Sequence, residues 1–213
     1  MIVEMGHRVS KMLSLFILTT VVGLVAASPA RTWPPTFCHG QDCPRYSVVT
    51  STADYEERLY EPAKWTSVTI SGSEYSSAVS EGFRKLFQYI SGANEEQAKI
   101  PMTVPVLNKV TPRQGSSMDV TVSFFVPYAD QTSPPEPSDP DVFTNTLPQM
   151  TAFVRHFSGF ARDNDWTENV AALAKSLDNA TISYHKDFYY TAGYDGPFTP
   201  TNRHNEVMFI KSD

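Results

Sequence analysis

The chain has 213 residues and a formal net charge of −6 at pH 7, with 17 basic and 23 acidic side chains. An acidic chain without a basic cluster argues against nucleic acid and against anionic membranes as partners. The length suits a single domain with a hydrophobic core of its own.

The first 27 residues differ in character from the rest. Residues 12–27 form an almost unbroken apolar run that follows two basic side chains and ends in the small-x-small pattern Val25-Ala26-Ala27. A spanning helix needs about 20 apolar residues, so a cleaved signal peptide over residues 1–27 is favoured over a membrane anchor. We therefore expect a secreted, extracellular protein without a stable membrane span. The sequon at Asn179 suits such a chain and predicts a glycosylation site.

Residues 28–45 contain four prolines and predict an extended N-terminal arm. Cys38 and Cys43 lie close together in this arm, and in an oxidising compartment such a pair predicts one disulfide that closes a short loop. Half of a metal site with His39 is the alternative. It is less favoured because the chain has no second cysteine pair.

The remaining chain alternates between strand and helix patterns. In order, the patterns predict strands over 55–60 and 65–71, a helix from a capping box at Ser71-Gly72-Ser73-Glu74 to about Ile90, strands over 102–110 and 120–126, a polar loop over 127–141, a strand over 151–157, a helix that opens at Asp163 or Asp165, and strands over 188–194 and 207–210. Each half thus has strands, one helix and two further strands. This predicts a pseudo-duplicated α+β domain, an antiparallel sheet curled into a distorted barrel with two helices packed outside.

Five motifs occur in the order typical of one family. They are Tyr55-Glu56-Glu57-Arg58 with Pro62-Ala63-Lys64-Trp65, Phe87-Gln88-Tyr89-Ile90-Ser91-Gly92-Ala93-Asn94, Pro101-Met102-Thr103-Val104-Pro105-Val106, Tyr189-Tyr190-Thr191-Ala192-Gly193-Tyr194, and Asn205-Glu206-Val207. Together they resemble the SOUL haem-binding protein family, with the domain expected over 46–213. The resemblance implies a distorted barrel with two helices, and reversible binding of haem or a similar tetrapyrrole by a carrier, scavenger or buffer.

The first predicted helix has an aromatic flank beside its core face. At 100° per residue, the side that faces the sheet should contain Val79, Gly82, Leu86, Tyr89 and Ile90. Phe83 and Phe87 lie off the centre of that side, so either a loop or a wide core covers them, or they form one wall of a shallow groove for a flat ligand. The resemblance implies that the ligand-binding residues are Ser80, Phe83, Phe87, Gln88 and, in the turn after Tyr194, Thr199.

The sequence departs from the family where haem would be anchored. Family members that bind haem well have basic residues near its propionates, and the candidates to replace them here are Arg84, Lys85 and Arg203. Some members also have a histidine, proposed as an iron ligand, at the position of Leu59. His156 and His204 remain as weak candidates for metal ligation, because a lone histidine is more often a hydrogen-bonded structural residue. Without an axial ligand, haem would be held mainly by hydrophobic contact.

No catalytic motif is found in the sequence, neither a nucleophile elbow, nor a zinc-binding His-Glu-x-x-His, nor a phosphate-binding glycine loop. We therefore expect a protein that is not an enzyme. Glu206 supports one alternative, a binder or hydrolase of another small amphipathic ligand in the same groove, because a buried carboxylate can mark a site. The competing interpretation is that Glu206 bonds to Arg58 or to a tyrosine inside the barrel.

Overall fold

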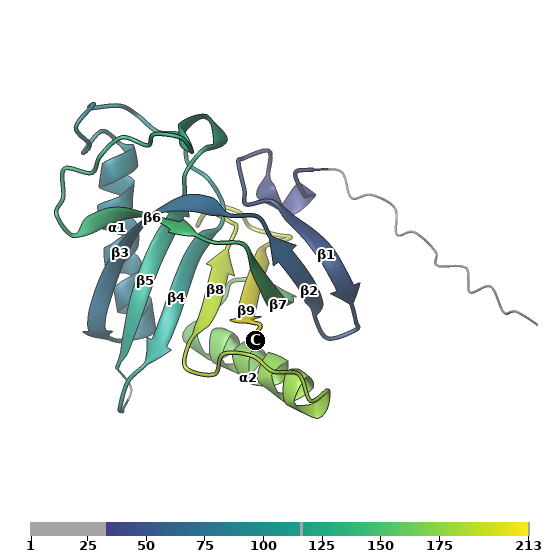
Figure 1. The fold of residues 1–213 in the computed structure, drawn as a ribbon. Helices are drawn as coiled ribbons and strands as arrows, with labels where there is room; N and C mark the ends of the chain where they lie inside the picture. The colour runs from purple at the N-terminus through teal and green to yellow at the C-terminus, as the bar shows by residue number, and fades with distance from the viewer. Residues whose placement is uncertain (1–32, 116, 213) are drawn as a thin grey trace, which may run out of the picture. The chain divides into compact units, whose positions relative to one another are not determined.

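The computed structural model describes residues 33–115 and 117–212 (Figure 1). The predicted signal peptide and the first residues of the arm lie outside these residues. Within the described part of the chain, no helix is long and apolar enough to cross a membrane.

One antiparallel sheet of nine strands organises the described residues, and two helices accompany it. The elements are β1 (Tyr46–Ser51), β2 (Glu56–Tyr60), β3 (Ala63–Ser73), α1 (Tyr75–Ile90), β4 (Val106–Pro112), β5 (Met118–Phe125), β6 (Val142–Leu147), β7 (Met150–Ser158), α2 (Asp163–Asn179), β8 (Tyr189–Gly193) and β9 (His204–Ile210). The strand order is β1-β2-β7-β9-β8-β4-β5-β3-β6, and the sheet curls strongly while β1 and β6 remain its edges (Figure 1). The predicted α+β class, with a distorted barrel and two helices, is confirmed.

The sheet order also shows the duplication. In the first half, β3, β5 and β4 are neighbours, and in the second half β7, β9 and β8 are neighbours in the equivalent order. The first strand of each half pairs with the other half, since β2 pairs with β7 and β6 pairs with β3. When β1 is left aside and each strand is replaced by its equivalent in the other half (β2 by β6, β3 by β7, β4 by β8 and β5 by β9), the order read from one end matches the order read from the other. The two halves are therefore related by a pseudo-two-fold axis between β4 and β8.

Several element boundaries differ from the predictions. The capping box at residues 71–74 was wrong, because β3 continues to Ser73 and Glu74 caps α1 without a side-chain hydrogen bond. Strand β4 begins at Val106 rather than at residue 102, since the preceding Pro105 has no N–H to donate to a ladder. Edge strands β1 and β6 were not predicted, because their partly exposed side chains lack a clear apolar alternation.

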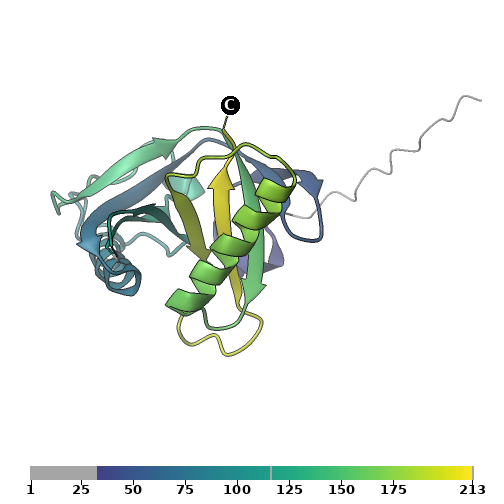
Figure 2. The ribbon, with the colours of Figure 1, turned by 90° about the horizontal axis from the view of Figure 1, so that it is seen from below.

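The sheet has two faces with different covers. The helical face carries α1 on β3 and β5, and α2 on β7 and β9, and Figure 2 shows α2 lying across the strands of the second half. The opposite face, here called the arm face, carries the N-terminal arm and a core that includes Trp65, Phe125 and Met208. The predicted disulfide between Cys38 and Cys43 is present, and both cysteines are buried in that core.

Helix α1 packs closely on the sheet at Gly82. A Cβ atom at this position would lie 2.5 Å from Cγ2 of Val122 and 3.3 Å from Cγ1 of Val68. Both valines are fully buried, so they have little room to move. The predicted core face of α1 is confirmed at Gly82, Leu86, Tyr89 and Ile90, whereas Val79 is only partly buried.

This contact predicts the effect of Gly82→Ala. Alanine favours a helix by about 1 kcal/mol over glycine, but overpacking against the sheet should cost about 1–3 kcal/mol. We expect a net loss in the free energy of unfolding by urea denaturation. The matched control is Ser77→Ala on the exposed side of α1, which should be neutral or stabilising; a stabilised Gly82→Ala variant would contradict the close packing.

Candidate functional site

A hollow of about 390 Å³ lies on the helical face between α1 and α2. Its lining residues come from four separate segments of the chain: Tyr75, Ser76, Val79, Ser80 and Phe83 of α1; Val106 and Asn108 of β4; Ala161, Asp163 and Trp166 at the start of α2; and Gly193 and Asp195 at the end of β8. The two helices cover the outer strands of their own halves, so the hollow lies over the central strands β4 and β8.

The floor of the hollow is polar and uncharged. The hydroxyls of Tyr75 and Thr191 share a hydrogen bond of 2.7 Å, and Nδ2 of Asn108 donates to the Thr191 hydroxyl at 3.0 Å. The Asn108 side chain is buried, and its Oδ1 has no hydrogen-bond partner among the described residues. Burial raises the pKa of Tyr75 above its ordinary value, so its phenol stays protonated.

The α1 wall of the hollow continues into an exposed aromatic surface. Phe83 is 37% exposed and Phe87 is 51% exposed, and their rings stack with centroids 5.9 Å apart. Phe83 is anchored from below by an edge contact with Phe124 at 5.3 Å. The described chain therefore leaves both phenylalanines uncovered, and this favours the groove wall over a covering loop.

The structure brings only some of the predicted ligand-binding residues together. Ser80 and Phe83 line the hollow, and Phe87 adjoins it one turn further along α1. Gln88 is exposed on α1 outside the lining, and Thr199 lies in the turn between β8 and β9, where its carbonyl accepts from Arg203.

The sequence did not single out Asn108, Asp163 or Trp166 as part of a site. Of these three, Asn108 alone had a feature in the sequence that could have indicated a site: it is a polar residue on the apolar side of a strand, between Val106 and Val110. Asp163 and Trp166 carried no indication, because they approach the hollow only through the packing of α2.

The candidate basic residues are in different environments. Lys85 pairs with Asp139 and Asp141 at 3.0 Å and 2.8 Å. Arg203 donates to carbonyl oxygens of the turn that follows β8, including that of Gly196 at 2.6 Å. Arg84 is exposed on α1 and is not among the residues that line the hollow.

The two candidate metal ligands lie away from the hollow. His156 pairs with Glu206 across β7 and β9, on the arm face, and its ring stacks on His204 with centroids 5.7 Å apart. Nε2 of His204 is 2.7 Å from Oε1 of Glu206. Across the described residues, no group of three His, Cys, Asp or Glu side chains could hold a metal ion.

Glu206 is fully buried on the arm face and belongs to an ion-pair cluster. Its carboxylate accepts from Nη1 of Arg58 at 2.9 Å and from the hydroxyl of Tyr194 at 2.8 Å. Burial opposes the charge, but the Arg58 guanidinium and the hydrogen bonds from His204 and Tyr194 outweigh it and lower the pKa of Glu206 to about 2. Glu206 thus bonds Arg58 and a tyrosine, as one interpretation of the sequence predicted.

The N-terminal arm covers this cluster. The Phe37 ring stacks on His204 at 4.0 Å and meets the edge of Tyr194 at 4.9 Å. Nε2 of His39 lies 3.0 Å from Oδ1 of Asp195. Glu206 is therefore enclosed on the face opposite the hollow, so the alternative in which a ligand in the groove uses Glu206 is not favoured.

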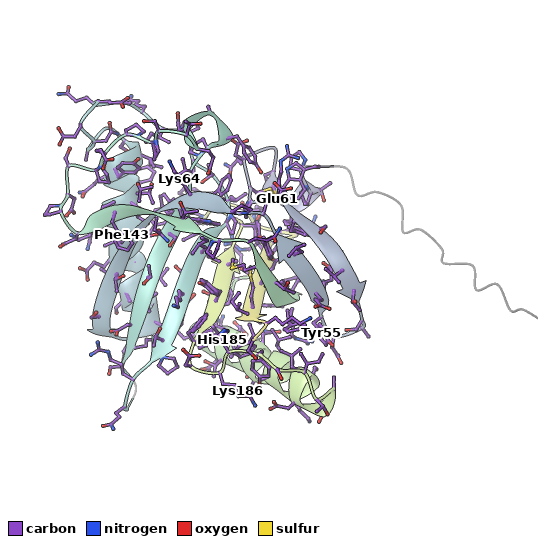
Figure 3. All side chains as sticks on the ribbon, viewed as in Figure 1. Tyr55, Glu61, Lys64, Phe143, His185 and Lys186 are labelled. Atoms are coloured by element: carbon purple, nitrogen blue, oxygen red, sulfur yellow. A yellow bond between two sulfur atoms is a disulfide. The ribbon has the colours of Figure 1, made fainter. Side chains whose placement is uncertain are left out.

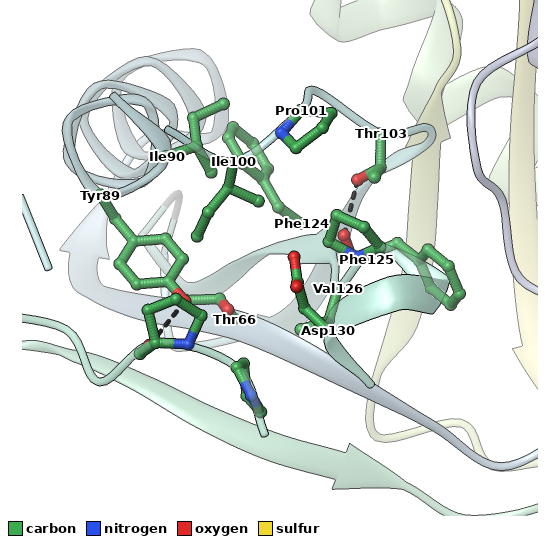
Figure 4. Close-up of a pocket in the computed structure, with 13 residues that line it drawn as sticks. Thr66, Tyr89, Ile90, Ile100, Pro101, Thr103, Phe124, Phe125, Val126 and Asp130 are labelled. Carbon is green, nitrogen blue, oxygen red and sulfur yellow. Dashed lines mark hydrogen bonds between the residues drawn. The ribbon is translucent and has the colours of Figure 1, made fainter. Parts of the chain in front are cut away.

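A second pocket is too small to be a ligand site. It is about 10 Å³ in volume and lies between α1 and the loop after β5 (Figure 4). Its surroundings are held by hydrogen bonds from Tyr89 to the Pro135 carbonyl at 2.7 Å and from Thr103 to the Phe125 carbonyl at 2.6 Å. Such a volume holds about one water molecule.

A curled antiparallel sheet with an open, aromatic hollow between two helices defines a small-ligand-binding domain. Residues 41–210 match the family model described as "SOUL heme-binding protein", and the chain belongs to this family. It is 40% identical over 161 residues to Heme-binding protein 2 of Homo sapiens, covering 75% of this chain and 78% of that protein. It is 35% identical to Heme-binding protein 1 of Xenopus laevis, covering 75% and 84% respectively.

The solved structures include one with the same fold and little sequence similarity. The crystal structure of the EcmrR C-terminal domain aligns with a TM-score of 0.54 and 13% identity, over 75% of this chain and 98% of that one. This similarity supports the architecture alone.

The Glu206 cluster predicts a specific dependence of stability on pH. The pKa of Glu206 falls from 4.5 to about 2 on folding, so its stabilisation is present above about pH 4.5 and is lost as the pH falls toward 2. The pKa shift of Glu206 contributes about 3 kcal/mol in full to the free energy of unfolding. At pH 7, Glu206→Gln should lower the free energy of urea unfolding by about 3–5 kcal/mol, because Arg58 is left buried without its partner.

The difference between wild type and Glu206→Gln should shrink as the pH is lowered from 5 to 3. Glu57→Gln is the control, since Glu57 pairs with Lys211 at 2.9 Å near the surface, and it should cost less than about 1 kcal/mol. A Glu206→Gln difference that is constant over this pH range would contradict a buried charged carboxylate.

Proposed function

We propose that the protein binds haem or a related tetrapyrrole reversibly in the hollow between α1 and α2. The main observation that supports this proposal is the exposed, stacked pair Phe83 and Phe87 at the edge of an open hollow of about 390 Å³. A tetrapyrrole is a large flat hydrophobic ring, and aromatic side chains bind such rings by stacking and by burial of apolar area. The names of the relatives, Heme-binding protein 1 and 2, support the same ligand class.

Hydrophobic contact would hold the ligand in preference to a bond to iron. The described residues that line the hollow include no histidine, cysteine or methionine. Tyr75 is the one lining residue with a phenol oxygen, and because burial raises its pKa it remains a protonated, weak ligand. Binding in the hollow would therefore use the tetrapyrrole ring and would not require the metal.

We infer a role in binding rather than in catalysis, as a carrier, scavenger or buffer. The carboxylate that would have served a hydrolase, Glu206, is paired with Arg58 and covered by Phe37. A secreted, extracellular location is part of this proposal. It is supported by the apolar leader pattern of the sequence, by the disulfide in the arm and by the exposed position of Asn179, the proposed glycosylation site, at the end of α2.

The function is tested by titrating the purified, disulfide-bonded protein with haemin and with iron-free protoporphyrin, followed by absorbance and by quenching of intrinsic fluorescence. We expect saturable binding of both ligands with similar affinity, since iron makes no bond to the protein. Phe83→Ala and Phe87→Ala should each weaken both by about tenfold.

Phe143→Ala is the matched control. Phe143 is 42% exposed on edge strand β6 and is not among the residues that line the hollow (Figure 3). Its substitution should leave both affinities unchanged. Binding of haemin alone would indicate an iron ligand and contradict the proposed mode, and no saturable binding of either compound would refute the proposed function.

A further inference from the structure

The floor of the hollow contains one hydrogen-bond acceptor that the described chain leaves unused. Asn108 of β4 is 3% exposed and lines the hollow. Its Nδ2 donates to the hydroxyl of Thr191 at 3.0 Å and to that of Tyr75 at 3.4 Å, so both amide hydrogens are engaged. Its Oδ1 has no hydrogen-bond partner among the described residues. A buried carbonyl oxygen without a donor is rare in a folded protein, and it lowers the free energy of unfolding.

The fold does not need an amide at this position. Val106 and Val110 flank Asn108 on the same side of β4, and Val110 is fully buried. A leucine has the same branched shape as asparagine and would continue this apolar row without an unpaired atom. The hydroxyls of Tyr75 and Thr191 would keep their mutual hydrogen bond of 2.7 Å. The unused Oδ1 is therefore explained better by a ligand that brings a donor than by the packing of the described chain.

The floor beside Asn108 has room for the edge of a ligand. In the ladder between β4 and β8, Thr191 lies opposite Asn108 and Gly193 lies opposite Val106. Gly193 lines the hollow, and a Cβ atom at this position would meet no residue within 4 Å apart from its chain neighbours. A flat ligand can thus rest its face on Phe83 of α1 while one edge enters the space over Gly193, next to the amide.

The unused oxygen defines the chemistry of that edge, because a carbonyl oxygen accepts from an N–H or O–H group. The rim of haem has methyl, vinyl and ionised carboxylate groups, and the nitrogens of the closed macrocycle point to its centre. Open-chain tetrapyrroles end instead in lactam rings, which present an N–H and a carbonyl on adjacent atoms. The bond between Tyr75 and Thr191 uses one of two hydroxyl hydrogens, so Tyr75, which lines the hollow, can offer the other to a ligand carbonyl.

We propose that Asn108 selects, among tetrapyrroles, an open-chain ligand with a lactam at its end. The lactam N–H donates to Oδ1 of Asn108, the lactam carbonyl accepts from the hydroxyl of Tyr75, and the neighbouring pyrrole rings lie against Phe83 and Phe87. The inference rests on the proposed function and deepens it, because it names a ligand class within the tetrapyrroles and the residue that recognises it.

The test compares two probes that differ at the donor: biliverdin, which has two terminal lactams, and biliverdin methylated on both lactam nitrogens. Each is titrated into the disulfide-bonded protein and followed by quenching of intrinsic fluorescence. Wild type should bind biliverdin about tenfold more tightly than the methylated compound. In Asn108→Leu the two affinities should agree within about twofold. The affinity of this variant for haemin should stay within about twofold of wild type, because haemin offers no N–H.

Urea unfolding without ligand separates recognition from a structural role. The unfolding midpoint of Asn108→Leu should be no lower than that of wild type, because an unpaired acceptor is removed. Asn169→Leu is the matched control on α2, outside the lining of the hollow. There Oδ1 accepts from Nε of Arg155 at 3.1 Å and Nδ2 donates to the carbonyl of Asp165 at 2.8 Å. Asn169→Leu should lower the midpoint and leave the preference for biliverdin unchanged.

A preference for biliverdin over the methylated compound that is lost in Asn108→Leu without loss of stability supports the inference. An equal preference in wild type and Asn108→Leu would reflect the bulk of the methyl groups and overturn it, as would the absence of a preference in wild type. A variant that loses stability and all ligands alike would show a structural role and also overturn it.

The inference and the proposed function fail in different ways. If haemin and protoporphyrin bind and biliverdin does not, lactam recognition fails and the proposed function stands. If biliverdin binds in a way that depends on Asn108 and haemin does not bind, lactam recognition stands and haem is excluded as the ligand. If none of these tetrapyrroles binds, both proposals fail.

Discussion

The ion pair between Arg58 and Glu206 is the constraint on which the arm face depends. Two charges buried in a protein interior must be paired and hydrogen-bonded, and this pair joins β2 of the first half to β9 of the second. Tyr194 and His204 complete the shell around the carboxylate, and Phe37 of the arm packs over them. The interior of the curled sheet is thereby filled, so the space for a ligand lies on the opposite face.

The position of the hollow follows from the duplication. Each helix packs on two strands of its own half, α1 on β3 and β5, and α2 on β7 and β9. The central strands β4 and β8, where the halves meet, remain between the two helices. The hollow thus combines residues from both halves, and its two walls differ in chemistry because the halves have diverged: α1 supplies exposed phenylalanines, and α2 supplies Asp163 and Trp166.

Periodicity predicted the features that depend on one element at a time. The helical spacing placed Gly82 and Leu86 on the sheet and Phe83 at the flank, and strand alternation placed Glu206 inward. Periodicity could not tell on which face of the sheet the groove lies, so both interpretations of Glu206, a groove residue or a partner of Arg58, remained open until the structure showed the pairing. Asn108 and Trp166 also escaped prediction, because they meet Tyr75 only through long-range packing of β4 and α2.

The exchange of first strands between the halves has a consequence for how the domain can be divided. The fold has the connectivity of a strand-swapped dimer joined into one chain, since β2 completes the sheet of the second half and β6 completes that of the first. A fragment that contains only the first half would lack β6, which borders its β3, and a fragment that contains only the second half would lack β2, which borders its β7. Cutting the polypeptide between β5 and β6 would therefore produce two complementary pieces that each need the other to close their sheets, rather than two independent modules.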